Sequence, residues 1–423
     1  MNYHRASLTA LLCLSLTTPS WGAPLTLKEC LEQAVAGNPS LKSAAWDSKV
    51  ARDGEFLTKA ATLPRVDVTA GYTMQLEPQA VKLGGVTAET QDATYATAGV
   101  AATYTVYDFG RREARIGQAQ SATRAAMENF QFARSDVSLQ VIEAFYRILE
   151  AEKIIQAATE EITQITEHRR VAQVLLEEGV VTRNDVLQAE VRLASAKQKK
   201  LSITNQYENS WLWLNYLTGR EPAFRSELDQ QTTPITAEPA PLTGTAINQR
   251  HDVLAQRQLL EASEFGIREN RENYLPEIFT RVAADYAQND KVREQTIYSA
   301  TLGIRLNIFD GSVAESSHGR AVKLRSKQLD TLRATEQRAL LEVATAANDT
   351  SVARERIAVT EAAIRQSEEN LRINQERYQE RVGIASEVLD AQTLVTQTKT
   401  EYYRAFYDYQ TASARLMKAR GEL

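Results

Sequence analysis

The stretch EGVVTRNDVLQA at residues 178–189 returns as ERVGIASEVLDA at residues 380–391, a shift of 202 positions along the chain. The same offset relates three further pairs of landmarks: Val106-Tyr107-Asp108 and Ile308-Phe309-Asp310, Leu214 and Leu416, and Gly219 and Gly421. The segment 106–219 is therefore built twice without net insertion. Internal repeats of this size decide the architecture of a chain before any local pattern does. We predict one duplicated design.

The first copy carries one longer loop. Leu63-Pro64 reappears as Leu275-Pro276 at an offset of 212, so ten extra residues lie between Pro64 and Tyr107 in the first copy. We predict that the two repeats span 23–220 and 244–423. The segment 221–243 is predicted to be the linker, because it contains Pro222, Pro234, Pro239 and Pro241.

Composition favours long solvated helices over a mixed α/β core. The 423 residues include 18 glycines and 10 prolines, and 24% of the residues are charged, which is the balance of extended helices. The net charge of −5 gives no reason to expect a nucleic-acid partner. Cys13 and Cys30 are the only cysteines and there are four histidines, so the sequence has neither a disulfide framework nor a metal-ligand cluster.

The N-terminus has the features of an export signal. His4 and Arg5 precede an apolar run at 8–16, which small residues follow. We predict a signal peptide at 1–22, and Cys30 is then the lone thiol of an exported protein. No later stretch approaches the roughly 18 or more apolar residues of a membrane-spanning helix.

Four segments alternate between apolar and polar or small residues, as strands with two different faces do. They lie at 66–76, 94–107, 277–287 and 297–309, close in length to the roughly 9 to 11 residues that cross a bilayer obliquely. Four strands cannot close a transmembrane barrel, for which about eight are the minimum. Either these segments form amphipathic hairpins in a soluble sandwich, or several chains pool them.

In the membrane interpretation, the alternation assigns a side to each residue of a strand. The residues predicted to face lipid are Leu302, Ile304 and Leu306. The residues predicted to face an aqueous barrel lumen are Arg281, Asp285 and Arg305.

Most of the remaining sequence is predicted to be helical. The predicted helices are 25–62, 110–177 and 182–217 in the first repeat, and 246–274, 311–380 and 386–419 in the second. Ile148, Ile155 and Ile162 recur every seven residues, a spacing typical of helices that pack side by side in a coiled coil.

Individual residues that could suggest chemistry are interpreted as packing or surface residues. The residues predicted to be solvated are His168, His251 and His318, and those predicted to pack are Cys30, Trp211 and Trp213. The sequence has no glycine-rich phosphate loop and no serine or cysteine nucleophile beside a histidine. An enzyme is therefore not supported, and no cofactor is expected.

The order helix, strand, strand, long helix, helix, given twice behind an export signal, resembles the TolC family of outer-membrane efflux and secretion channels. The resemblance is most specific at 179–189, at 387–392, at the strand exits 107–110 and 309–311, and at the opening segment 25–41. It implies a mainly α fold with a transmembrane β portion. Three copies would close a 12-stranded outer-membrane β-barrel, which a long periplasmic α-helical barrel continues.

The resemblance also implies a function and partners. The protein would be the outer-membrane exit duct of a tripartite efflux pump or type I secretion system in a Gram-negative bacterium, with a large periplasmic portion. It would be a homotrimer in outer-membrane lipid, and its partners would be a periplasmic adaptor (membrane fusion) protein and an inner-membrane RND, ABC or MFS transporter. The alternative is an elongated periplasmic coiled-coil adaptor or scaffold, which would have no use for four strands with an apolar outer face.

By the same resemblance, functional residues gather at the two helix turns. The tips expected to dock the adaptor are Gly179-Val180 and Arg381-Val382, and Arg381 stands where the family usually has glycine. Arginine resists the positive φ that glycine permits. We therefore expect an adaptor fitted to this tip.

The resemblance further places a periplasmic gate beside these tips. Glu387 and Asp390 occupy the family's constriction positions, where three-fold symmetry would set six carboxylates around one axis and favour cations. The simpler alternative is that both acids suit the positive end of a helix dipole. Tyr378 and Asp185 are expected to form a latch between the tips that holds the closed state.

Overall fold

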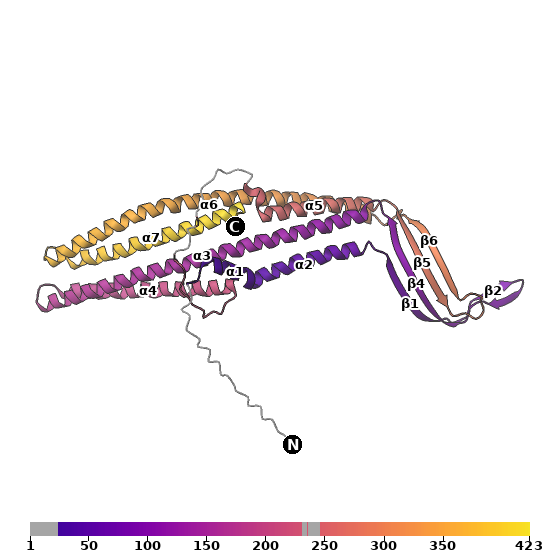
Figure 1. The fold of residues 1–423 in the computed structure, drawn as a ribbon, viewed down its shortest axis with the longest axis horizontal. Coiled ribbons are helices and arrows are strands. Elements are labelled where there is room, and N and C mark those ends of the chain that lie inside the picture. The colour runs from indigo at the N-terminus through magenta and orange to yellow at the C-terminus, as the bar shows by residue number, and fades with distance from the viewer. Residues whose placement is uncertain (1–23, 231–234, 236–245) are drawn as a thin grey trace, which may run out of the picture.

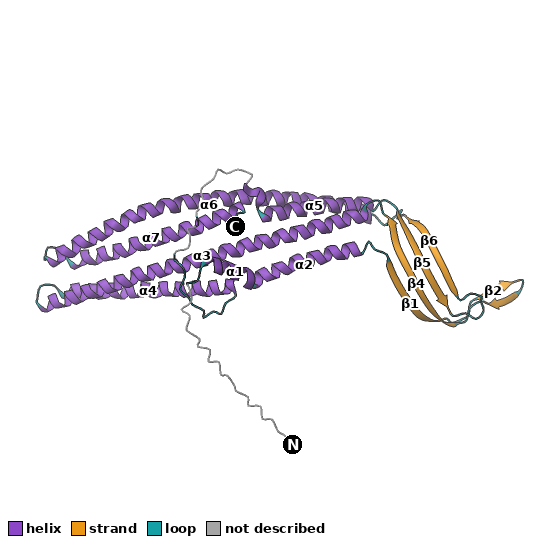
Figure 2. Ribbon diagram, viewed as in Figure 1, coloured by secondary structure: helices purple, strands orange, loops and turns teal. Residues whose placement is uncertain are grey.

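The computed structural model describes residues 24–230, 235 and 246–423. Helices form a long rod, and a sheet continues from one end of it (Figure 1). Figure 2 shows that helices and strands are separated along the length of the molecule, which confirms the mainly helical prediction with a strand portion. The predicted signal peptide and part of the predicted linker lie outside the described residues. Within the described ranges, no helix is long and apolar enough to cross a membrane.

The described elements fall into two similar series. The first is α1 (Leu27–Gly37), α2 (Pro39–Ala60), β1 (Arg65–Met74), β2 (Ala80–Leu83), β3 (Val86–Glu89), β4 (Thr94–Tyr107), α3 (Arg111–Glu177) and α4 (Arg183–Thr218). The second is η1 (Ala246–Gln249), α5 (His251–Glu272), β5 (Glu277–Ala287), β6 (Thr296–Arg305), α6 (Val313–Gln379) and α7 (Ala385–Arg420). The helices α3 and α6 have 67 residues each, and α4 and α7 have 36 each. These equal lengths follow from the offset of 202 residues.

The prediction of one helix at 25–62 is wrong, because the helix is interrupted at Asn38. Pro39 has no N–H to donate and starts α2 at its first position, where no donor is needed. The Asn38 side chain accepts from Leu41 N at 3.1 Å and donates to the Leu217 carbonyl at 3.0 Å. This break fixes α1 against the end of α4 and lets α2 run alongside α3 (Figure 1).

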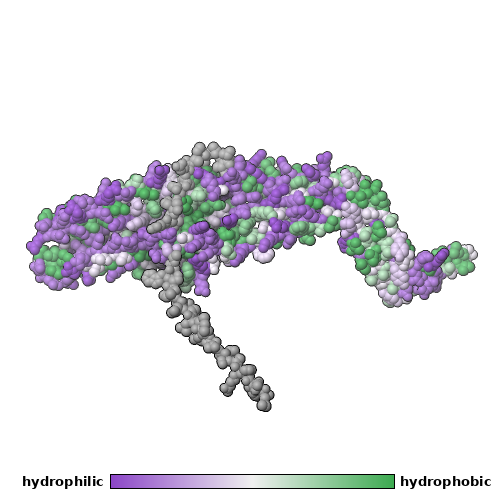
Figure 3. Space-filling view, in the orientation of Figure 1, coloured by the Kyte–Doolittle hydropathy of each residue, from purple (hydrophilic) through white to green (hydrophobic). Residues whose placement is uncertain are grey.

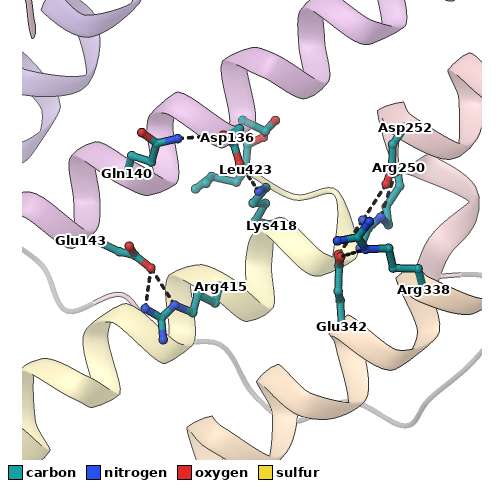
Figure 4. Close-up of polar contacts among 11 residues, drawn as sticks. Asp136, Gln140, Glu143, Arg250, Asp252, Arg338, Glu342, Arg415, Lys418 and Leu423 are labelled. Carbon is teal, nitrogen blue, oxygen red and sulfur yellow. Dashed lines mark hydrogen bonds and ion pairs between the residues drawn. The ribbon is translucent and has the colours of Figure 1, made fainter. Parts of the chain in front are cut away.

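The prediction of one helix at 246–274 is also wrong, because the short 3₁₀ turn η1 is separated from α5 by the extended residue Arg250. The buried guanidinium of Arg250 lies 2.8 Å from Glu342 Oε2 and donates to the Ala419 carbonyl at 3.1 Å. Figure 4 shows the ion pairs of Arg250 with Asp252 and Glu342, and beside them the ion pairs that bind the end of α7 to α3. Lys418 Nζ lies 2.6 Å from Asp136 Oδ1, and Arg415 Nη2 lies 2.7 Å from Glu143 Oε1.

The sheet is antiparallel, in the order β1-β4-β5-β6. Its register sets residues of opposite character on its two faces. One row runs Val68–Val100–Ala284–Tyr298, and a row on the other face runs Arg65–Thr103–Arg281–Thr301. In Figure 3, green hydrophobic residues gather over the sheet, whereas the helical rod is mostly purple on the face shown. The predicted strand 297–309 runs four residues past the end of β6 at Arg305, because its partner β5 begins after Pro276, which has no N–H to extend the ladder.

The two-stranded hairpin β2–β3 was not predicted, and it occupies the longer loop of the first copy. It spans ten residues, 80–89, the same number by which the first copy exceeds the second. Gly84 and Gly85 both have positive φ, at 56° and 93°, as the two central residues of a tight hairpin turn require. Lys291 Nζ attaches the base of the hairpin to the β5–β6 turn, at 2.6 Å from Glu89 Oε2.

The largest apolar cluster lies at mid-rod, where α1, α3, α4 and α7 meet. Trp211, Phe145 and Cys30 are fully buried there, so the packing roles predicted for Cys30 and Trp211 are confirmed. Burial raises the pKa of the Cys30 thiol to about 11. The prediction for Trp213 is wrong, because its side chain is exposed, with its ring stacked on Tyr216. Leu228, from the first part of the predicted linker, packs in the cluster and pairs with Leu25.

Candidate functional site at the helix tips

The α3–α4 and α6–α7 turns lie side by side at the end of the rod farthest from the sheet (Figure 1). Both have the same backbone geometry. Gly179 has φ 72° and Arg381 has φ 62°, so the arginine adopts the left-handed conformation that favours glycine, at a cost of the order of 1 kcal/mol. Val180 N donates to the carbonyl of Leu175, and the equivalent Val382 N donates to Arg377, each at 2.8 Å.

The two tips expose apolar side chains beside charged ones such as Arg381 and Glu380. Val180 and Val382 are both exposed, and Ile384 extends the apolar surface of the second tip. Exposed apolar side chains on a tight turn are typical of a surface that another protein covers.

The candidate gate carboxylates are each paired with an arginine. Glu387 Oε2 lies 3.2 Å from the Arg377 guanidinium of α6, and Asp390 Oδ1 lies 2.5 Å from Arg192 Nη2 of α4. The two acids therefore turn toward different neighbours, although they share the start of α7. The bridge between Arg192 and Asp390 joins the two helical hairpins and crosses a cleft of about 320 Å³ between α4 and α7. Sequence reasoning missed both arginines, because the pairing depends on how the helices are placed in space.

The predicted latch between Tyr378 and Asp185 is not formed. Asp185 Oδ2 instead accepts from the backbone N and the side-chain oxygen of Thr182, each at 2.9 Å, and so caps α4. A carboxylate at this position accepts from the backbone N–H of the N-cap residue, as in a capping box. The buried hydroxyl of Tyr378 makes no hydrogen bond with any described residue. Burial, and secondarily the nearby Asp185 charge, raises the pKa of Tyr378.

His168 is buried, so the prediction that it is solvated is wrong. Its side chain, on α3, lies against Tyr378 of α6 with 5.1 Å between the ring centroids, and only 7% of its surface is exposed. Burial lowers the pKa of His168, and the Asp185 charge opposes that shift in part. The heptad positions Ile165 and Ala172 could have placed His168 on the packed face of α3, since it lies between them at helical spacing.

Four of the buried polar groups without partners lie along this seam between the hairpins. His168 Nε2 and Glu161 Oε2 of α3, the Tyr378 hydroxyl of α6 and Gln392 Oε1 of α7 are all buried, and none has a hydrogen-bond partner among the described residues. Burial raises the pKa of Glu161, which contacts Thr396 one turn after Gln392. An unsatisfied buried polar group costs about 1–3 kcal/mol. Water would satisfy these groups if the hairpins separated, so the seam resists opening less than a fully bonded one.

Comparisons with known proteins agree over most of the chain. The sequence model of the family "Outer membrane efflux protein" matches residues 30–220 and 242–422. Protein CyaE of Bordetella pertussis is 24% identical, over 96% of this chain and 87% of its own, and the alkaline protease secretion protein AprF of Pseudomonas aeruginosa is 21% identical, over 92% and 83%. The outer membrane protein VceC of Vibrio cholerae has a similar fold, with a TM-score of 0.83 and 20% identity over 93% of this chain and 96% of its own.

We predict that acidification separates the two tips through His168. The pKa of the buried imidazole lies below its ordinary value of about 6.5, so an opened form binds the proton more tightly than the closed form. Closed-state stability should fall as the pH drops through 6.5 toward the lowered pKa. The raised pKa of Glu161 acts in the opposite direction, and a Glu161→Gln background removes that contribution.

The measurement is a pulsed electron paramagnetic resonance distance between spin labels at Glu178→Cys and Glu380→Cys. The buried Cys30 should not compete for the label. In the Glu161→Gln background the distance should widen between pH 7.5 and 5, and His168→Phe should abolish the change. His318→Gln, on the same pair of hairpins, is the matched control and should retain it. A pH response that persists in His168→Phe would show that another group titrates.

Proposed function

The chain belongs to the outer membrane efflux protein family, and we propose that three copies of it assemble into one continuous duct. The protein is the outer-membrane exit duct for substrates that an efflux or secretion machinery delivers, and it extends into the periplasm. The alternative of a periplasmic adaptor is set aside, because family membership places the chain in the outer membrane. Conduction through such a duct is passive and needs no catalytic group.

The sheet carries the proposal of a shared barrel. Its edge strands β1 and β6 have no neighbour among the described strands on their outer sides. The unpaired N–H and C=O groups of such edges can form hydrogen bonds with a strand of another chain. One face is lined by exposed apolar residues, among them Val68, Tyr298, Leu302 and Ile304. If β1 of one copy pairs with β6 of the next, three sheets of four strands close without an edge. The apolar face then meets lipid, and Arg281, Asp285 and Arg305 face the lumen.

The tips support the proposed docking and gating roles. We assign Gly179, Val180, Arg381 and Val382 to contact with a periplasmic adaptor, because they form an exposed, partly apolar end of the rod. An inner-membrane RND, ABC or MFS transporter would deliver the substrate. In this proposal the closed state is stabilised by the salt bridges Arg192–Asp390 and Arg377–Glu387. A hydrogen bond between Tyr378 and Asp185 plays no part in it. In a trimer the six carboxylates would carry six arginine partners.

The barrel is tested by placing a charge on either face of β6. Ile304→Arg should cost about 2–4 kcal/mol if this position meets lipid near the membrane midplane, and should reduce the amount of assembled trimer. Ile304→Leu should be silent. Ser299→Arg, on the opposite face, is the matched control and should be tolerated. The readout is the trimer fraction in mild detergent, after fractionation with outer membranes. Equal tolerance of arginine at 299 and 304 would contradict the assignment of faces.

Docking is tested at the strained arginine. Glycine adopts the positive φ of position 381 without strain, so Arg381→Gly should not destabilise the fold. The substitution also removes a charged group from the tip. Affinity for the adaptor of the same system should fall about tenfold, the loss expected for one charged hydrogen bond. Arg333→Gln, on an exposed part of α6, should leave affinity unchanged. Calorimetry with the purified adaptor decides this, and undiminished binding of Arg381→Gly excludes a docking role for that residue.

The gate is tested by single-channel recording in planar bilayers. Arg192→Gln removes the bridge to Asp390 and should raise conductance, because that bridge spans the cleft between the hairpins. Tyr378→Phe is the comparison variant: the tyrosine hydroxyl makes no described hydrogen bond, so its removal should not raise conductance. Glu387→Ala combined with Asp390→Ala should lower cation selectivity. If all three variants conduct and select like the parent, the gate lies elsewhere.

A further inference from the structure

Arginine side chains converge at the foot of the sheet, where it meets the helical rod. Arg65 of β1, Thr103 of β4, Arg281 of β5 and Thr301 of β6 stand directly opposite one another in a single cross-strand row. Arg305 of β6 pairs with Glu277 of β5, two rows closer to the helices on the same face. Side chains two residues apart along a strand share a face, so these groups project to one side.

A cleft of about 680 Å³ opens between these side chains. Its charged lining consists of Arg65, Arg112, Arg281, Arg305 and Glu277, so four guanidinium groups face a single carboxylate. The remaining lining is largely threonine, with hydroxyls that also donate hydrogen bonds. We call this the arginine cleft.

Three of the four arginines are already held in place by acids or rings. Arg65 Nε lies 2.8 Å from Asp67 Oδ1, and Arg112 Nε lies 3.3 Å from Asp108 Oδ2. Arg305 Nη1 lies 2.8 Å from Glu277 Oε1, and its guanidinium lies 4.8 Å from the centroid of the Phe279 ring. Glu277 also pairs with Arg111 of α3, at 2.5 Å, so its charge is divided between two arginines.

Arg281 differs from the other three. Its side chain is exposed in the middle of the row, and within the described part of the chain it forms no ion pair or hydrogen bond. The flanking groups in its row are the hydroxyl residues Thr103 and Thr301. A free guanidinium between hydroxyl donors has the fork geometry that binds carboxylate and phosphate groups with two hydrogen bonds.

We propose that the arginine cleft binds the carboxylate or phosphate groups of solutes that pass through the duct, with Arg281 as the main contact. The proposal rests on the proposed function, because it places this face of the sheet toward the lumen. Three copies would then bring together twelve of these arginines, against three copies each of Glu277, Asp67 and Asp108, and leave a net positive collar where the helical tunnel meets the barrel. Walls of low dielectric focus such a field on the passing solute.

The collar would select passing solutes by their charge and not by their shape. It would raise the local concentration of anionic solutes after they have passed the tips, where the carboxylates Glu387 and Asp390 favour the opposite sign. Because the cleft is open to water, added salt should weaken the interaction within a screening length of about 10 Å at 0.1 M.

The test is block of single channels by inorganic tripolyphosphate in planar bilayers. Arg281→Gln removes a side chain with no described partner, so the fold should be retained. It should raise the half-blocking concentration about tenfold, as expected for the loss of a charged hydrogen bond, and shift the reversal potential toward cation selectivity. Arg281→Lys keeps the charge and should retain the selectivity while losing part of the block. Exchanging zwitterionic for anionic lipid should leave the block unchanged, which separates a luminal site from lipid phosphates.

Arg293→Gln is the matched control, because Arg293 is 95% exposed in the β5–β6 turn at the opposite end of the sheet. It should behave like the parent. If Arg281→Gln is blocked and selects like the parent, or if Arg293→Gln changes block equally, the cleft is not an anion site. A parent protein that forms no pores at all would overturn the proposed duct together with the collar.

Discussion

The hydrogen-bonding requirement of the strand backbone constrains the whole molecule. A sheet of four strands has two open edges, and its apolar residues stand exposed on one face. A single chain can neither pair those edges nor bury that face. Copies of the same sheet can pair the edges, because closing a barrel removes every edge, and lipid would then cover the apolar outer face. The helical hairpins of the copies must then have the same length to form one tunnel. The equal lengths of α3 and α6, and of α4 and α7, let both hairpins of a chain end at one level.

The architecture could be predicted from the sequence because its determinants are periodic or repeated. The offset of 202 residues predicted two long helices and two return helices, and α3 and α6 begin and end within a few residues of expectation. The strand alternation predicted the two faces of the sheet. Two features that were not predicted, the break between α1 and α2 and the hairpin β2–β3, have recognisable signals in the sequence. Pro39 after Asn38 marks a helix start, and Gly84-Gly85 between short β-prone runs marks a hairpin turn.

The candidate site was less predictable, because its contacts depend on how separate helices face one another. Asp185 had two possible roles, and the pattern of Thr182 followed by Asp185 three residues later is a capping box that can be recognised in sequence. The bridge from Arg192 to Asp390 has no comparable signal, since it depends on the placement of α4 beside α7. The arginine cleft likewise needs the strand register, which alone brings Arg65 and Arg281 into one row.

The distribution of buried groups explains how the rod can be stable at its middle and still able to open at its tips. At mid-rod, Trp211 and Phe145 pack in a largely apolar cluster, and ion pairs bind the end of α7 to α3. Each buried apolar side chain contributes about 1.5–3 kcal/mol to stability. This contribution is lost if the helices separate. Toward the tips the apolar clusters are smaller, one around Val388 and one around Leu389, and the bridging ion pairs are exposed and contribute at most about 1 kcal/mol each. Water can substitute for the exposed ion pairs, and less apolar surface is buried at the tips than in the large mid-rod cluster, so separation should begin at the tips and stop at that cluster.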